Sequence, residues 1–132
     1  MTSRCNYYTA LLFKQRPDLH MTLQYYANKT PDKLAKIITD VHAVVGRSDM
    51  PFDQFKVKFD QEDWFGPKHT VRVLRPANEH THWPVWVQML IPNHWAPHVS
   101  TVNDRALTLE ATDLVIMSKK REIVRWPLGK KR

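Results

Sequence analysis

Alternation of apolar and polar side chains dominates this chain and predicts several β-strands. In LHMTLQYY, Leu19 to Tyr26, every second residue is apolar, which is the period of a strand with one buried face. A run rich in aromatic and apolar residues predicts a strand at 6–14, and further strands are predicted at 55–59, 69–74, 108–117 and 122–126. We expect the strands at 55–59 and 69–74 to pair antiparallel, and a basic turn from Ser118 to Arg121 to join the last two strands.

One stretch has the period of an amphipathic helix instead. Thr30 is expected to cap it, Pro31 suits its first turn and Gly46 ends it. Its apolar positions form a single stripe made of Leu34, Ile37, Ile38, Val41, Val44 and Val45, with His42 near the edge. The region 76–97, rich in Trp, His and Pro, predicts only a short strand at 85–90. Strands and a helix in this order predict an α+β fold.

Length and composition indicate one soluble domain. With 132 residues and 42% hydrophobic content, the chain can bury one core, so we expect a single domain over residues 1–132. Cys5 is the only cysteine, which excludes an internal disulfide and fits a reducing cytoplasm. The early apolar run YYTALLF is too short to cross a membrane and is followed by Lys14, Gln15 and Arg16. We therefore expect no membrane partner.

The chain is basic, and this favours anionic partners without identifying one. Its formal net charge is +7 and its sequence pI is about 9.7, as in many proteins that bind phosphates or nucleic acid. A solvated face of Lys and Arg explains the same balance equally well. The cluster Lys119, Lys120 and Arg121 could steer phosphates, but a solvated hairpin turn is the simpler interpretation.

Two similar pairs of side chains suggest a reaction. His20 and Thr22 share the polar face of one strand, and His98 and Ser100 share a face if their segment is extended. Displacement at a phosphodiester needs a base on the attacking oxygen and an acid on the leaving oxygen. Two facing imidazoles can supply both without a metal, because imidazole titrates near neutral pH. The hydroxyls could donate hydrogen bonds to the nonbridging oxygens.

These pairs resemble the signature of the two-histidine (2H) phosphoesterase superfamily, a pair of His-x-Thr/Ser motifs on strands lining a cleft. LHMTL at 19–23 matches well, and DLVIMSKKREIVRWPL at 113–128 is similar to the family's closing hairpin. APHVST at 96–101 matches less fully, with Ser100 where Thr is commoner and Thr101 where an aliphatic residue is usual. The resemblance implies an RNA ligase-like fold of two lobes, with antiparallel sheets lining a central cleft and one or more flanking helices.

The resemblance also implies a function. In length the chain is similar to compact viral and phage members, including the anti-CBASS nucleases that destroy cyclic oligonucleotide signals. It implies a metal-independent phosphodiesterase acting on cyclic or short RNA-like oligonucleotides, with no cofactor and no obligate protein partner, located in the cytoplasm, or in the host cytoplasm for a viral protein. Alternatives are a phosphodiesterase for 2′,5′-oligoadenylate or RNA 2′,3′-cyclic phosphates, a non-catalytic nucleotide-binding module of the same fold, and a basic structural protein that binds nucleic acid through its surface.

The expected catalytic residues are therefore His20, Thr22, His98 and Ser100, and the residues do not decide which histidine is the acid. Tyr26 and Trp95 are expected to stack on substrate bases, because each lies close in sequence to a catalytic pair.

A metal site made of His80, His82 and His94 is the competing interpretation of the remaining histidines. No carboxylate or cysteine cluster completes a ligand set around them, so we expect surface histidines and no metal.

Overall fold

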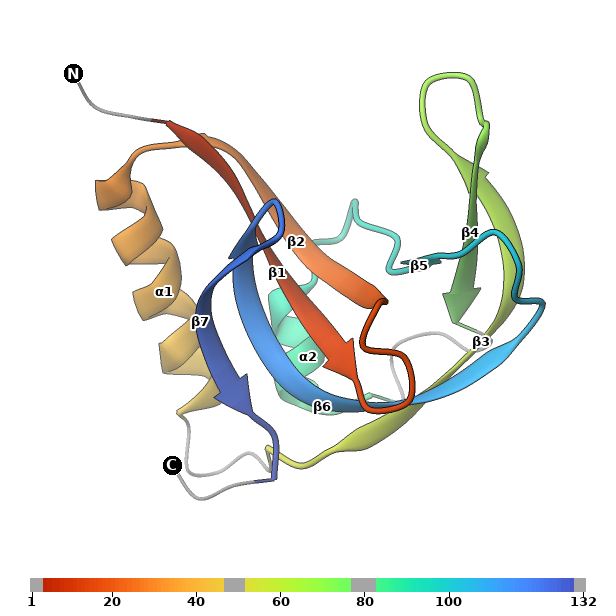
Figure 1. The fold of residues 1–132 in the computed structure, drawn as a ribbon. Coiled ribbons are helices and arrows are strands. Elements are labelled where there is room, and N and C mark those ends of the chain that lie inside the picture. The colour runs from red at the N-terminus through yellow and green to blue at the C-terminus, as the bar shows by residue number, and fades with distance from the viewer. Residues whose placement is uncertain (1–3, 47–51, 77–82, 130–132) are drawn as a thin grey trace.

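The computed structural model describes residues 4–46, 52–76 and 83–129. Within these ranges, seven strands form one antiparallel sheet and two helices pack against it (Figure 1). The predicted α+β class is thus confirmed. Neither helix in the described ranges is long and apolar enough to cross a bilayer. We also expect an irregular link at 48–51 and a basic tail at 129–132; the whole of this link and residues 130–132 of the tail lie outside the described residues.

The first and the last strand of the chain both pair with the same central strand, β6 (Leu107–Ser118). They are β1 (Cys5–Phe13), β2 (His20–Lys29), β3 (Phe55–Phe65), β4 (Val71–Pro76), β5 (Val99–Ser100), β6 (Leu107–Ser118) and β7 (Arg121–Pro127). The sheet order is β2-β1-β6-β3-β4-β5, and β7 also pairs with β6. The first part of β6 pairs with β3, and its later part pairs with β1 and β7. Because β6 serves both halves, the fold has one continuous sheet where separate sheets were expected.

Both helices cover the same side of this sheet. Helix α1 (Pro31–Val45) and helix α2 (Val85–Leu90) contact each other and β2. Their apolar faces meet the buried sides of the strands in one core, whose largest fully buried members include Trp86, Phe59 and Leu11. Full burial of each such side chain contributes about 1.5–3 kcal/mol to folding. The other face of β1 and β2 is left free of helices, and this face carries the polar residues of interest.

Helix α1 agrees closely with its prediction. Thr30 occupies the N-cap position and Pro31 the first turn, but the Thr30 side chain makes no capping hydrogen bond. Its backbone carbonyl instead accepts the first helical bond from Leu34. Gly46 ends the helix in a right-handed conformation, so positive φ is not the reason for glycine here. A Cβ atom would lie 2.9 Å from the His42 carbonyl oxygen, and this close approach requires glycine.

The β3–β4 hairpin is longer than the sequence pattern indicated. Strand β3 continues through Asp60–Asp63, where a register shift between Phe59 and Gln61 interrupts the alternation that defined the prediction. Strand β4 begins at Val71, since His69 has a φ of 51° and belongs to the turn. The predicted antiparallel pairing of these two strands is confirmed.

The strand predicted at 85–90 is wrong. This segment is helix α2, in which Trp86, Val87 and Leu90 are buried while Val85 and Met89 are exposed. Buried positions at i, i+1 and i+4 share one helical face, but they cannot share one face of a strand. Packing of Trp86 against Phe52 and Phe55 provides the tertiary contacts that outweigh the β-propensity of the two valines.

Candidate active site

His20 and Thr22 lie on the face of β2 that no helix covers. Register places His20 opposite Leu12 and Thr22 opposite Ala10 of β1, so both side chains point to the same side of the sheet. The His20 ring stacks on Tyr8, with ring centroids 5.2 Å apart and planes 27° apart. The polar face predicted from the alternation in β2 is therefore confirmed, and an aromatic ring on the neighbouring strand supports its imidazole.

His98 and Ser100 stand at the opposite edge of the sheet. Ser100 pairs with Val73 of β4, and His98 lies two residues before it on the same side. The edge of the His98 ring meets Phe65, at a centroid distance of 4.5 Å. Nδ1 of His98 is 2.8 Å from the Ala96 carbonyl oxygen. Because a carbonyl only accepts, Nδ1 carries a proton and Nε2 is the nitrogen left to gain or lose one.

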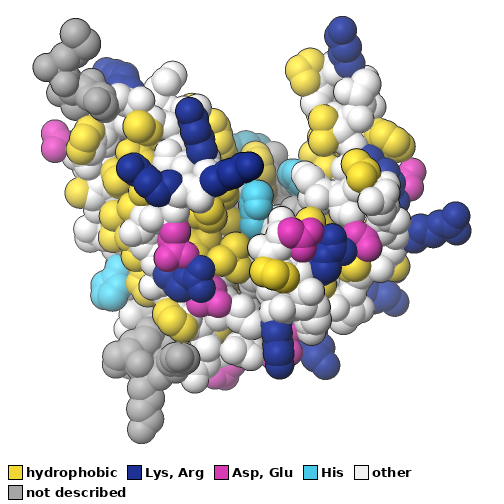
Figure 2. Space-filling model, in the orientation of Figure 1, with side chains coloured by type: hydrophobic (Ala, Val, Ile, Leu, Met, Phe, Trp, Pro, Cys, Tyr) yellow, Lys and Arg dark blue, Asp and Glu magenta, His cyan; other side chains and the backbone are white. Residues whose placement is uncertain are grey.

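The fold brings these two edges together. Strands β2 and β5 contact each other although they are the outermost strands of the sheet. The indole N–H of Trp95 donates to the Thr22 carbonyl oxygen at 2.7 Å, which ties the segment before His98 to the strand of His20. Figure 2 shows a hollow between the β1–β2 side and the β3–β4 hairpin, with histidine side chains exposed in it. We call this region the histidine hollow.

Electrostatics indicate that the two rings share this hollow. Loss of water around the ring lowers the pKa of His20, and repulsion from His98 lowers it further. His20 still keeps solvent contact. Desolvation likewise lowers the pKa of His98, while the Ala96 carbonyl acts in the opposite direction. Arg75 lowers the pKa of His98 and Asp63 raises it, so an ion pair also faces this ring. Both histidines therefore favour the neutral form more than free imidazole does.

The two hydroxyls are available for a ligand. Thr22 is half-buried and Ser100 is exposed. Among the described residues, neither side-chain oxygen has a hydrogen-bond partner, whereas the hydroxyl of the adjacent Thr101 donates to Asp104 at 2.6 Å. That bond explains how the buried position of Thr101, where an aliphatic residue was expected, accommodates a hydroxyl.

Tyr26 does not lie where the sequence placed it. A register shift between Thr9 and Ala10 changes the alternation of β2, so that Tyr26 pairs with the buried Tyr7 and its hydroxyl bonds to Thr9 at 3.1 Å. It thus lies on the face opposite His20. Tyr25, opposite Tyr8 and 48% exposed, takes the place on the open face. The bulge that causes this exchange has no signal in the sequence.

Trp95 is near the site as expected, but in a bridging position. Its ring centroid is 6.0 Å from that of His98, with the planes tilted by 31°. The side chain is half-buried against the core, and its N–H is used by Thr22. The contacts therefore assign Trp95 a role in joining β2 to the His98 segment.

The sequence pattern did not link four side chains to the two histidines. They are Tyr8 beside His20, and Phe65, Arg75 and Asp63 beside His98. Arg75 and Asp63 form an ion pair at 3.4 Å and are both partly exposed. The alternation of the 71–74 segment, continued by one residue, would have placed Arg75 on the face of Val73. Only the β4–β5 pairing shows that this face meets His98.

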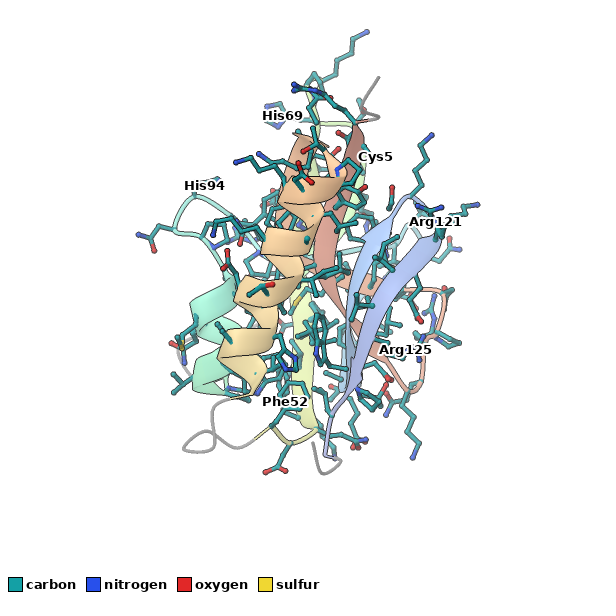
Figure 3. All side chains as sticks on the ribbon, turned by 90° about the vertical axis from the view of Figure 1, so that its left-hand side faces the viewer. Cys5, Phe52, His69, His94, Arg121 and Arg125 are labelled. Atoms are coloured by element: carbon teal, nitrogen blue, oxygen red, sulfur yellow. The ribbon has the colours of Figure 1, made fainter. Side chains whose placement is uncertain are left out.

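The described histidines outside the hollow do not form a cluster. His80 and His82 lie outside the described residues, and His94 is exposed on the turn after α2. Figure 3 shows His94 and His69 on separate parts of the molecule. No group of three or more potential ligands occurs within residues 4–46, 52–76 and 83–129. Lys119 and Lys120 form the exposed turn between β6 and β7, and Arg121, the first residue of β7, projects outward in Figure 3.

Comparison with known proteins supports the fold through structure alone. No family model and no curated protein sequence matches the chain. Among solved structures, E. coli LigT in its apo form matches with a TM-score of 0.64 at 12% identity, over 98% of this chain and 100% of that one. LigT complexed with ATP matches with a TM-score of 0.63 at 14% identity, over 98% and 100%. A structure described as a phosphoesterase matches with a TM-score of 0.60 at 13% identity, over 96% and 99%. The chain therefore has the fold of the LigT-like phosphoesterases over nearly its whole length.

Proposed function

We propose that this protein is a metal-independent phosphodiesterase that cleaves short or cyclic RNA-like oligonucleotides with His20 and His98. The observation that carries the proposal is the convergence of two histidine–hydroxyl pairs from the outermost strands of the sheet. The fold supports it, because LigT has been solved with ATP, with 3′-AMP and with NADP⁺. Cleavage of signalling nucleotides and a viral role remain predictions from the family resemblance.

The histidine hollow has the groups that in-line displacement requires. One neutral imidazole removes the proton from the attacking oxygen, and one protonated imidazole gives a proton to the leaving oxygen. The two arise from opposite edges of the sheet, so a phosphate between them is approached from two sides. Thr22 and Ser100 donate to the nonbridging oxygens, where their hydrogen bonds strengthen as charge moves onto those atoms. Arg75, on the His98 side, shares its charge with Asp63 at 3.4 Å, and its remaining N–H groups can donate to the phosphate.

The most accessible nucleophile in a 3′,5′-linked substrate is the neighbouring ribose 2′-hydroxyl. It already lies beside phosphorus and avoids much of the entropic cost of recruiting water. As the O2′–P bond forms and the P–O5′ bond breaks, one histidine takes the 2′ proton and the other protonates O5′. The products are a 2′,3′-cyclic phosphate and a free 5′-hydroxyl. In a cyclic oligonucleotide, one such cut opens the ring.

Substrate analogues test this mechanism directly. A panel of cyclic di- and trinucleotides, 2′,5′-oligoadenylate, RNA dinucleotides and 2′,3′-cyclic phosphates, with products separated by charge, identifies the substrate class. For a 3′,5′ substrate, replacing the 2′-hydroxyl at the cleaved linkage by hydrogen should abolish cutting and largely preserve binding. Undiminished cleavage of the deoxy substrate would show direct attack by water. Binding without turnover across the panel would favour the alternative of a non-catalytic nucleotide-binding module.

A further inference from the structure

A cavity of about 390 Å³ adjoins the histidine hollow on the Ser100 side. It lies between three segments that are distant in sequence: the β1–β2 turn, the start of β4, and β5 with the loop after it. Ser100 belongs to its lining, and so does Leu19, the residue before His20. The cavity is within the size range of small-ligand sites, and it opens beside a hydroxyl that we assign to the scissile phosphate.

Two apolar side chains on the wall of this cavity are unusually exposed. Val71 is 49% exposed and Val102 is 75% exposed, and both line the cavity. The described chain therefore covers about half of Val71 and leaves most of Val102 open. An apolar surface beside a polar reaction centre suits a flat ligand with an apolar face, and the face of a nucleobase is of this kind.

The charges in the cavity lining are already neutralised. Arg16 donates to both oxygens of Asp18, at 3.0 and 2.9 Å, and to Asp104 at 2.8 Å. Arg72 donates to Glu62 at 3.1 Å and to the Thr101 carbonyl at 2.9 Å. These partners hold both guanidinium groups in place, and they leave little unbalanced positive charge for a second phosphate. The cavity is therefore better suited to an uncharged group.

Two polar side chains in the cavity lining are free to form hydrogen bonds with the edge of a base. Asn103 offers an amide with both donors and an acceptor, and Thr70 offers a hydroxyl. In the described part of the chain, neither side chain is occupied by another residue. Asn103 follows Val102 directly, so one loop presents an apolar contact and a polar one. Bases are recognised in this way, by contact with the face and hydrogen bonds at the edge.

We infer that this cavity is a nucleobase subsite that binds the nucleoside on one side of the scissile phosphate, with Val71 and Val102 against the base and Asn103 at its edge. The inference rests on the proposed function for the position of the phosphate. It makes the preferred substrate an oligonucleotide of at least two residues, because a mononucleotide 2′,3′-cyclic phosphate cannot fill both sides of the site. The cavity thus provides selectivity for length.

A bulky side chain at the exposed position 102 tests the subsite with little risk to the core. The test compares kcat/KM for adenylyl-(3′→5′)-adenosine with kcat/KM for adenosine 2′,3′-cyclic phosphate. Val102→Trp should lower the ratio of the two values about tenfold, because the indole fills the space for one base. The matched control is Val85→Trp, at a position on α2 that is 59% exposed and outside the cavity lining, which should leave the ratio unchanged. An unchanged ratio for Val102→Trp would overturn the subsite.

Binding separates this inference from the proposed function. The dissociation constant of 2′-deoxyadenylyl-(3′→5′)-adenosine, measured by calorimetry, should rise about tenfold in Val102→Trp and stay constant in Val85→Trp. If the wild type binds this ligand with that dependence and cleaves no RNA substrate, the proposed function fails and the subsite stands. Equal dissociation constants in wild type and Val102→Trp, with cleavage intact, would refute the subsite alone.

Discussion

Replacement of Trp95 by Phe tests whether the two histidine segments depend on a single hydrogen bond. The indole N–H of Trp95 donates to the Thr22 carbonyl at 2.7 Å, on the edge strand β2. Phe keeps an aromatic ring and removes only the donor, leaving a half-buried carbonyl without its partner. Such a loss costs about 1–3 kcal/mol. Urea denaturation should therefore show a lower midpoint with an unchanged slope.

The same substitution should affect turnover more than stability alone explains. Trp95 also lies beside the His98 ring, so loss of the tether lets His98 shift relative to His20. Misplacement of a catalytic group by about 1 Å can cost on the order of a hundredfold in rate, and we expect kcat of the folded variant to fall roughly 10- to 100-fold.

Trp126→Phe is the matched control for this experiment. Trp126 donates through the same indole nitrogen to Nδ1 of His42, at 3.3 Å, in a contact between β7 and α1. Its removal should cost about 1 kcal/mol of stability and leave kcat unchanged, because the contact is on the helix-covered side. A Trp95→Phe variant with wild-type kcat, or a Trp126→Phe variant that loses equal activity, would refute the tether.

Three further predictions concern the chemistry. The pKa values of His20 and His98 are both lowered, so the state with one protonated and one neutral imidazole is most populated below the ordinary imidazole pKa of about 6.5. A plot of kcat/KM against pH should therefore peak on the acid side of that value, and a profile still rising at pH 8 would contradict this. Thr22→Ala and Ser100→Ala should each cost about 3 kcal/mol in the transition state, measured as kcat/KM, whereas a change confined to thermal stability would indicate a structural role. Activity should survive excess chelator; loss of activity in chelator with rescue by a divalent ion would instead favour a metal site made of His80, His82 and His94.

The sequence was most informative for elements in which a local pattern of apolar residues marks the face that is buried. The alternation at 19–26 placed His20 and Thr22 together on the open side of β2, and the stripe in α1 ended at Gly46 as expected. Both features depend on local properties, namely side-chain period, the φ angle that Pro fixes in the first helical turn and the missing Cβ of Gly. They require no knowledge of the rest of the fold.

The features that the sequence could not supply depend on contacts between distant segments. The bulge in β2 exchanges Tyr25 and Tyr26 between faces, and α2 forms because Trp86 packs into the core. The meeting of His98 with Phe65 follows from the pairing of β4 with β5. Residue spacing contains no information on these long-range pairings. His98 and Ser100 could therefore be predicted as site residues, but the side chains that contact them could not.

Turnover by single histidine variants tests the central claim most directly. The substrate identified by the panel is used, and its cleavage is measured under single-turnover conditions in excess chelator. The variants are His20→Ala, His98→Ala and the control His94→Ala. Each variant is first shown to unfold at the same denaturant midpoint as the wild type. The account predicts a rate at least about a hundredfold lower for His20→Ala and for His98→Ala, as expected for loss of a general acid or base, and a wild-type rate for His94→Ala. A near-wild-type rate in either His20→Ala or His98→Ala would contradict the two-histidine mechanism.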